Sequence, residues 1–318
     1  MKEIRKSKGD WTQFLSGVPA KDYVFQAAPY EEQIKKAAEM IRNSDMVLIG
    51  AGAGASAAAG LTYSGTRFTD NFDEFIEKYG SANMTDMYAA GFYPFPTPEA
   101  KWGYWSKHSI INRFVPPALP LYQMIYQIVQ KKDHFVLTTN VDHQFWKAGF
   151  TDERIFATQG DYGMIQCEKG CHQKIYDADK LFHQMDQARR DCTVPSYMVP
   201  ACPVCGGNMA MYLRSDQYFV EDEHWHEAAK RYGYFRERIN NKKAVLLELG
   251  VGFNTPVIIR FPFEKMMREY ENLSLIRLNL NDAVIPESFG KRAIGINADM
   301  EKTIIDLCKE LDKIEKAE

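Results

Sequence analysis

Two close pairs of cysteines are the residues whose spacing most clearly indicates chemistry. Three residues separate Cys167 from Cys171, two separate Cys202 from Cys205, and 30 residues lie between the pairs. Thiolates spaced in this way bind a tetrahedral Zn²⁺ at about 2.3 Å. Because four sulfurs leave no open coordination position, we expect the zinc to be structural. Independent buried thiols or a redox pair are the alternatives.

Three other residues bear on this metal site. Cys192 lies between the pairs and could replace a ligand, and His172, directly after Cys171, is a rival ligand. Cys308 lies in the segment 299–316, which has the pattern of a helix, and we expect it to face the core as a small apolar residue.

A second group of residues forms a loop that is almost bare of side chains. The apolar run 46–49 leads into Gly-Ala-Gly-Ala-Gly-Ala-Ser at 50–56. A strand that turns here into a helix would present backbone N–H groups to an anion such as a pyrophosphate. The loop lacks the plain GxGxxG spacing, so a tight packing turn is the alternative. The expected cofactor-binding residues in this loop are Gly52, Ala53, Gly54 and Ser56.

Polar residues and glycines also follow the later strands. Because ligands of open α/β sheets bind beyond the carboxyl ends of the strands, we expect these residues to share one site with the glycine loop. They are Thr139, Asn140 and Asp142 after one apolar run, Gln159 after the next, and Gly250, Gly252 and Asn254 after a third.

The elements that would position these residues are short apolar strands alternating with helices. Runs that are apolar on both faces, separated by helical segments, predict a parallel sheet covered on both sides, which is a doubly wound, Rossmann-like α/β fold. The expected strands are 46–52, 134–140, 154–158, 244–252, 274–280 and 292–297, and the expected helices include 30–43, 118–131, 256–271 and 299–316.

The rhythm of strands and helices breaks twice, and these breaks predict the domain organisation. We expect an N-terminal helical segment at 1–45 and a Rossmann-like domain made of 46–160 and 241–318. This domain would carry a helical insertion at 62–115. A small zinc-binding lobe would span 161–240. The aromatic stretch 92–106 within the insertion could form a groove for an acceptor, although such stretches usually pack in a core.

Composition excludes several other classes of protein. The chain has 318 residues, 45% of them hydrophobic, and a formal net charge of −3. This charge offers no field that would hold nucleic acid or an anionic membrane. The basic N-terminus has no apolar segment of a secretory signal, and no apolar run is long enough to cross a bilayer. Clustered cysteines fit a reducing compartment, so we expect a cytoplasmic protein.

Taken in order along the chain, these motifs resemble the sirtuin family over about residues 30–315. The GAGAS loop and Ala58–Leu61 correspond to the family's GAG-x-S and Ala/Ser-Gly-Ile, and 139–142 (TNVD) corresponds to its Gln-Asn-Ile-Asp. The cysteine pairs, the 250–254 turn, 278–280 and 295–298 follow in the family's order. The resemblance implies that NAD lies across the cleft between the large domain and the zinc lobe, with its adenine end near Asn279 and Asn297.

The chain departs from this family at the residue that acts as its base. Sirtuin deacylases have His-Gly before the zinc lobe, where this chain has Gln159-Gly160. An amide exchanges hydrogen bonds but takes no proton near neutral pH. The pattern is similar to the class M, macrodomain-linked sirtuins of microbial pathogens. That likeness implies protein mono-ADP-ribosylation, with a lipoylated carrier protein related to the glycine-cleavage H protein as acceptor and a macrodomain hydrolase as functional partner.

The resemblance also implies roles for the catalytic residues. Asp142 would bind the nicotinamide carboxamide, Asn140 the ribose and a water, and Gln159 the ribose hydroxyls. Deacylation needs a base for its second half and would lose about 10²–10⁴-fold without one, so transfer is favoured. Arg67 is expected to bind NAD or an acceptor carboxylate, with a surface ion pair as the alternative, and Arg214 to brace the zinc lobe.

Two other functions remain alternatives at this stage. The chain could be an NAD-dependent deacylase or delipoylase that uses another base. It could also be a sensor that closes over NAD without turning it over. His143, next to Asp142, is a possible substitute base, but we expect it to lie on the surface or at a helix start.

Overall fold

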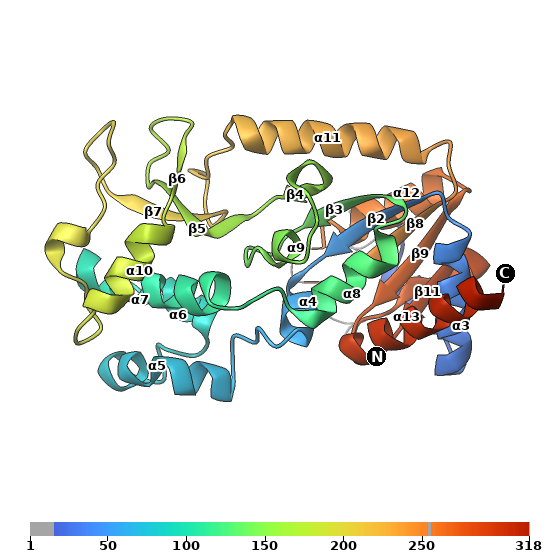
Figure 1. Cartoon of the computed structure of the whole chain (residues 1–318), viewed down its shortest axis with the longest axis horizontal. Helices are drawn as coiled ribbons and strands as arrows, with labels where there is room; N and C mark the ends of the chain where they lie inside the picture. The colour runs from blue at the N-terminus through green and yellow to red at the C-terminus, as the bar shows by residue number, and fades with distance from the viewer. Residues whose placement is uncertain (1–15, 254–255, 318) are drawn as a thin grey trace.

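The central element is a six-stranded, fully parallel sheet. The computed structural model describes residues 16–253 and 256–317. The strand order is β11-β9-β8-β2-β3-β4, so chain order reverses between β8 and β2 (Figure 1). The strands are β2 (Met46–Ala51), β3 (Asp133–Thr138), β4 (Ile155–Ala157), β8 (Ala244–Leu249), β9 (Leu273–Leu278) and β11 (Ala293–Ile296).

The predicted strands are present because their residues are apolar on both faces. All six residues of β2 and all six of β8 are buried, as expected for a sheet that is covered on both sides. Each strand ends before the glycine or polar residue that follows it, so these residues lie at the carboxyl edge. The prediction of a doubly wound α/β fold is confirmed.

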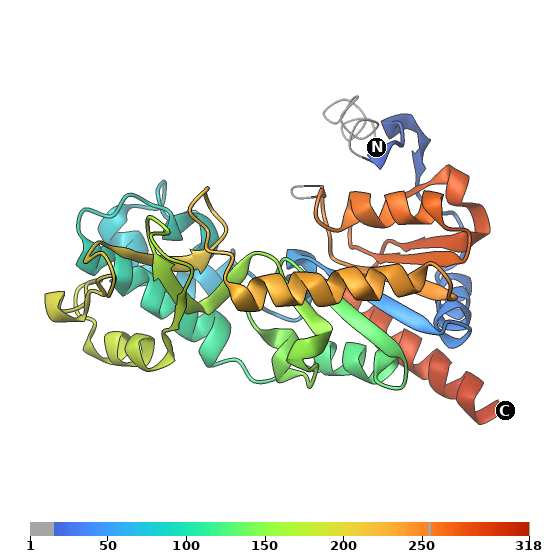
Figure 2. The ribbon, with the colours of Figure 1, turned by 90° about the horizontal axis from the view of Figure 1, so that it is seen from above.

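Helices cover both faces of this sheet (Figures 1 and 2). One face packs on α3 (Tyr30–Arg42), α8 (Pro120–Val129) and α13 (Met300–Ala317), whose apolar residues share one cluster with β2 and β8. The other face packs on α11 (Glu223–Ile239) and α12 (Arg260–Glu269). No helix among the described residues is long and apolar enough to cross a membrane.

A second body of structure lies beyond the carboxyl edge of the sheet. Its three-stranded antiparallel sheet has the order β6-β5-β7. Trp102 and Trp105 of α7 share a buried cluster with β5, β7 and α10, so the helical insertion and the cysteine segment pack as one unit. The elements are α5 (Thr66–Tyr79), α6 (Met87–Gly91), α7 (Pro98–Ser109), a π-helix (Ile110–Phe114), β5 (Gly160–Cys167), β6 (Ile175–Asp177), α10 (Asp179–Ala188) and β7 (Met209–Leu213).

The aromatic stretch 92–106 is mainly core. Trp102, Tyr104 and Trp105 are at most 2% exposed, whereas Phe92 is 46% exposed. The interpretation of this stretch as an open acceptor groove therefore has no support from these three rings.

The expected domain division stays a prediction, and one helix in the range of the zinc lobe packs on the large sheet. Helix α11 falls in the range predicted for the zinc lobe, but its Phe235 packs with Phe135 of β3, at a ring distance of 5.4 Å. Ala228 and Ile239 join the same cluster. The apolar side of α11 therefore covers β3 and β4 on one face of the large sheet. Residues 1–15 of the predicted N-terminal segment lie outside the described residues, and the other boundaries remain predictions.

A buried network of charges fixes the strand ends around the site. Arg277 of β9 bonds to Glu248 of β8 and Glu264 of α12, at 2.8 and 2.9 Å, and all three side chains are fully buried. Arg260 donates to the backbone oxygen of Asp282 at 2.6 Å. Paired buried charges of this kind are costly to break, so they hold the loop after β9 in one position.

The remaining short elements connect these layers. They are a 3₁₀ turn (Ala20–Asp22), β1 (Tyr23–Val24), α4 (Ala53–Ala58), α9 (Gln144–Lys147), a 3₁₀ turn (Asp152–Arg154), a 3₁₀ turn (Ser196–Met198), β10 (Ile285–Pro286) and a 3₁₀ segment (Glu287–Arg292). Strands β1 and β10 form a separate antiparallel pair.

Candidate functional site

The four paired cysteines come together in the second body of the structure. The Sγ atoms of Cys167 and Cys205 lie 3.8 Å apart, and those of Cys171 and Cys202 lie 3.6 Å apart. All four sulfurs lie within 4.8 Å of one another. A tetrahedral zinc with four thiolates requires sulfur–sulfur distances of about 3.8 Å. The residues present therefore fit a closed, structural Zn²⁺ site.

The other residues considered for this site have different places. Cys192 is buried among the aromatic residues of the insertion, and burial raises its pKa to about 11. Cys308 lies on α13 and packs against the core, as expected. His172 lies beside the cluster, with Nδ1 3.0 Å from Cys171 Sγ, while its Nε2 bonds to the hydroxyl of Tyr176 at 2.8 Å.

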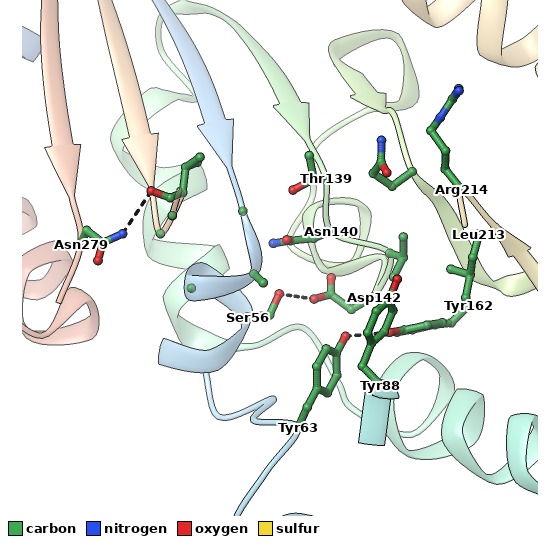
Figure 3. A pocket seen from close by; sticks show the side chains of 18 of the residues that line it. Ser56, Tyr63, Tyr88, Thr139, Asn140, Asp142, Tyr162, Leu213, Arg214 and Asn279 are labelled. Carbon is green, nitrogen blue, oxygen red and sulfur yellow. Dashed lines mark hydrogen bonds between the residues drawn. The ribbon is translucent and has the colours of Figure 1, made fainter. Parts of the chain in front are cut away.

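A cavity of about 550 Å³ opens at the carboxyl edge of the large sheet, where the strand order reverses (Figure 3). This is the place where open α/β sheets bind their ligands. Residues that follow β2, β3, β4, β8 and β9 all contribute to it. The lining residues are Gly52, Ala53, Gly54, Ser56, Tyr63, Tyr88, Thr139, Asn140, Val141, Asp142, Gln159, Tyr162, Leu213, Arg214, Gly250, Val251, Gly252, Asn279, Asn281 and Asp282.

The small residues of the glycine loop allow a close contact between two backbones. The N–H of Gly54 donates to the oxygen of Gly250 at 3.0 Å. A Cβ on Gly54 would lie 2.7 Å from Gly250 Cα, and Gly250 itself has a φ of +62°. The packing-turn interpretation is therefore correct for Gly54, and the same turn forms one wall of the cavity.

This contact predicts the effect of a larger side chain at Gly54. In Gly54→Val, the new side chain would collide with the backbone of Gly250, and such overpacking costs about 1–3 kcal/mol. We expect a lower melting temperature together with weaker NAD binding, measured by calorimetry. Gly233→Ala, on α11 where a Cβ meets nothing within 4 Å, is the control. An unchanged melting temperature in Gly54→Val would contradict the contact.

The carboxylate of Asp142 lies at the inner end of the cavity and is 2% exposed. It accepts a short hydrogen bond from Ser56 Oγ and another from the N–H of Gln144 at 3.0 Å. Burial raises the pKa of Asp142, and these two donors oppose that shift. Ser56 also bonds to the hydroxyl of Tyr122 at 3.0 Å, and Asn140 Nδ2 donates to that hydroxyl at 3.2 Å. This network of hydrogen bonds fixes the side chains of Asp142 and Asn140, which point into the cavity.

An amide and an arginine form the wall between the two bodies of structure. Gln159 is half-buried, and its Nε2 lies 3.3 Å from Thr158 Oγ1. Its backbone oxygen accepts from the N–H of Arg214 at 3.0 Å. The guanidinium of Arg214 bonds to Glu221 at 2.6 Å and covers the ring of Phe219 at 4.1 Å. Arg214 therefore braces this junction, as predicted, and also lines the cavity.

Three tyrosines of the cavity were not among the predicted site residues. The hydroxyls of Tyr63 and Tyr162 lie 2.9 Å apart, and the ring of Tyr88 stacks on that of Tyr63 with 6.2 Å between ring centres. Tyr162 stands three residues after Gln159, and Tyr63 follows the glycine loop. Their pairing depends on how the second body of structure folds, and no spacing rule of the sequence predicts it.

The structure does not bring every predicted residue to the cavity. Arg67 does not line it, and its guanidinium donates to the oxygen of Thr62, to that of Ile111 and to Asn112 Oδ1, at 2.8, 2.9 and 2.8 Å. These hydrogen bonds hold the guanidinium of Arg67 within the helical insertion. Its contact with NAD or an acceptor stays a prediction.

Three further asparagines that we expected to bind NAD lie in different places. Asn297 does not line the cavity, and its Nδ2 donates to the oxygen of Leu280 at 2.7 Å. Asn279 lines it, next to Asn281 and Asp282. Asn254 lies outside the described residues. Contact of these residues with NAD remains a prediction.

No histidine is among the described residues that line this cavity. His143 begins α9 and has a φ of 65°. Its Nδ1 pairs with Asp161 at 2.6 Å, and its ring stacks on Trp146. It therefore lies at a helix start, as expected. His108 is fully buried, and burial lowers its pKa to about 3.

Comparison with characterised proteins gives two relatives of similar sequence. The "Protein ADP-ribosyltransferase" of Staphylococcus aureus (strain Mu50) is 34% identical over 274 residues, which cover 85% of this chain and 86% of that protein. The "Probable bifunctional ADP-ribose hydrolase/ADP-ribosyltransferase" of Fusarium oxysporum f. sp. cubense is 32% identical over 294 residues, which cover 86% of this chain but only 48% of that protein. No protein-family model matches the chain.

Solved structures of Sir2 enzymes share the fold. A crystal structure of a Sir2 homologue in complex with NAD matches with a TM-score of 0.59 and 14% identity, covering 93% of this chain and 99% of that one. A structure described under the mechanism and regulation of Sir2 enzymes matches with a TM-score of 0.57 and 17% identity, covering 89% and 99%. At these identities the likeness concerns the fold alone.

Proposed function

The chain belongs to the sirtuin-type protein ADP-ribosyltransferases, and from this premise we propose that it transfers a single ADP-ribose group from NAD to a lipoylated carrier protein. The observation that carries the proposal is the amide of Gln159 in the wall of a cavity that, among residues 16–253 and 256–317, no histidine lines. The Staphylococcus relative, named as a protein ADP-ribosyltransferase, supports the general activity.

In the proposed reaction, the bond between the nicotinamide nitrogen and ribose C1′ breaks, and its electron pair leaves with nicotinamide. A nucleophilic atom of the acceptor forms the new bond to C1′ and loses its proton, if it carries one, to water. The ribose carries developing positive charge in the transition state, and fixed polar groups stabilise such charge. Asp142 supplies a carboxylate, buried and held by Ser56, close to where nicotinamide would lie.

The other residues hold the ribose and the phosphates. Asn140 and Gln159 would bind ribose hydroxyls from two sides of the cavity, and the backbone at 52–56 would receive the pyrophosphate. Asn279 would lie near the adenine end, since it lines the part of the cavity beyond β9. The absence of a group that takes a proton at Gln159 favours transfer, because only deacylation needs a base in its second half.

We further propose that the enzyme belongs to the class M, macrodomain-linked branch and that a macrodomain hydrolase removes the modification. The Fusarium relative supports this part, since its name joins an ADP-ribose hydrolase to an ADP-ribosyltransferase and this chain spans about half of its length. A cytoplasmic location is supported by the six free cysteines.

The experiment compares two forms of one acceptor. Wild-type enzyme and NAD are incubated with an H-like carrier protein that is either lipoylated or unmodified, and intact mass reports ADP-ribosylation. We expect modification of the lipoylated form and at least tenfold less of the unmodified form. Equal modification of both forms would contradict the role of the lipoyl group while leaving the transfer activity in place.

A further inference from the structure

Two phenols meet at the inner end of the cavity, beside the carboxylate of Asp142 (Figure 3). Tyr63 comes from the loop after α4, and Tyr162 from β5. Their hydroxyl oxygens lie 2.9 Å apart, and both side chains line the cavity. The backbone fixes each residue, since the oxygen of Tyr63 accepts from Met87 N–H at 2.8 Å and the N–H of Tyr162 donates to Val141 at 2.9 Å.

The surroundings keep both phenols neutral. Burial raises the pKa of Tyr63, and the nearby charge of Asp142 raises it further. Burial likewise raises the pKa of Tyr162 well above its usual value. The ring of His108 packs edge-on against that of Tyr162, with 4.5 Å between ring centres, and burial keeps His108 neutral by lowering its pKa. Neither phenol can therefore act as a base, but each keeps its proton.

The pair of phenols has one O–H proton left to donate to a ligand. Each phenol has one O–H donor, and one of the two protons is used in the bond between them. Within the described residues the two hydroxyls make no other hydrogen bond. Tyr162 is 0% exposed, whereas Tyr63 is only partly buried. The arrangement with Tyr162 as donor leaves the free proton on Tyr63, facing the cavity.

A carboxylate next to a neutral O–H donor is complementary to a primary carboxamide. The amide N–H₂ donates and its C=O accepts, so Asp142 can take the first and Tyr63 can serve the second. Both oxygens of Asp142 already accept one bond each, but a carboxylate has about four acceptor positions and can accept more. Ser56 does not compete for the C=O, because its single proton is donated to Asp142. Asn140 donates one of its two N–H groups to Tyr122 and keeps the other for the ribose.

We propose that Tyr63, oriented by Tyr162, is a specificity-determining residue that donates a hydrogen bond to the carboxamide oxygen of the nicotinamide group. This inference rests on the proposed NAD site and adds to it the recognition of the leaving group. The ring of Tyr88, which is 40% exposed, stacks on that of Tyr63 and also lines the cavity.

The test pairs protein variants with altered ligands. Dissociation constants are measured by calorimetry, without acceptor, for NAD, for its 3-acetylpyridine analogue and for an analogue with an unsubstituted pyridine. The acetylpyridine analogue keeps the C=O but lacks the N–H₂, and the pyridine analogue lacks both. The proteins are wild type, Tyr63→Phe, Tyr162→Phe and the double variant. Tyr93→Phe, in the insertion but outside the cavity, is the matched control.

We expect Tyr63→Phe to weaken the binding of NAD and of the acetylpyridine analogue by about threefold to tenfold, which is the range of one neutral hydrogen bond. The dissociation constant of the pyridine analogue should not change. The double variant should bind NAD no more weakly than Tyr63→Phe, because the two hydroxyls act as one unit.

If Tyr63→Phe weakens the binding of all three ligands equally, the hydroxyl only supports packing. If Tyr63→Phe weakens the binding of none of them, the hydroxyl does not contact the ligand. Either result overturns the proposal. If the wild-type protein itself binds none of the three ligands, the proposed NAD site is wrong. The failure of the NAD site can thus be distinguished from the failure of the role proposed for Tyr63.

Discussion

Replacing Cys202 by serine will remove the bound zinc and unfold the second body of the structure. Cys202 is 3% exposed, and its Sγ lies 3.6 Å from that of Cys171. Because this position is buried, a serine there cannot shift to bring its hydroxyl within binding distance of the metal. Binding of a structural zinc contributes about 10–16 kcal/mol to folding in small zinc-binding peptides, which exceeds the stability of most domains. Metal analysis should find about one zinc per chain in wild type and none in Cys202→Ser.

The effect should reach the cavity through two strands. Cys167 ends β5, and the turn with Cys202 and Cys205 precedes β7. The other ends of the same strands carry Tyr162 and Leu213, which line the cavity. Loss of zinc should therefore also remove NAD binding. Cys308→Ser is the control, since this thiol lies outside the cluster. A soluble, zinc-free Cys202→Ser protein that binds NAD normally would refute the structural role.

The second large effect is expected at Gln159. In Gln159→Ala, the side chain that would hold the ribose is lost, and misplacement of a reacting group costs on the order of 10²-fold in rate. We expect that loss in kcat/KM for ADP-ribosyl transfer, with the melting temperature unchanged. Gln184→Ala, exposed on α10, is the matched control. Activity within twofold of wild type in Gln159→Ala would show that this amide does not bind the reacting ribose.

The pH dependence of transfer should reflect Asp142 and not Gln159. An amide has no titrating proton, so no inflection near pH 6.5 should arise at Gln159. Asp142 acts as an anion, and burial raises its pKa. Activity should therefore fall as the pH drops through that raised pKa, at higher pH than for an exposed aspartate near 3.9. Gln159→His should introduce a new inflection without simply increasing transfer.

The parts of this molecule that follow from local pattern were predictable. Strands β2 and β8 are apolar on both faces, so their burial in a parallel sheet followed from the sequence. The cysteine spacing predicted a cluster that the folded chain forms. The residues after each strand were expected at one edge, because parallel strands end together.

Features that depend on distant contacts were not predictable from local pattern. Arg67 was expected at the nucleotide, but Ile111 and Asn112, more than 40 residues away, supply its partners. The hydroxyl pair of Tyr63 and Tyr162 joins residues 99 positions apart. Helix α11 covers the large sheet although it follows the cysteines in the chain. In each case the partner lies on another element, which composition and periodicity do not specify.

Identifying the products that the wild-type enzyme makes from NAD distinguishes ADP-ribosyl transfer from deacylation in one measurement. The enzyme is incubated with NAD, an acyl-lysine peptide and a lipoylated H-like protein together, and all products are weighed by mass spectrometry. We expect free nicotinamide and an ADP-ribosylated protein, with the acyl-lysine peptide unchanged. Efficient formation of acylated ADP-ribose and a deacylated substrate, with no ADP-ribosylated protein, would contradict this expectation and identify the enzyme as a deacylase.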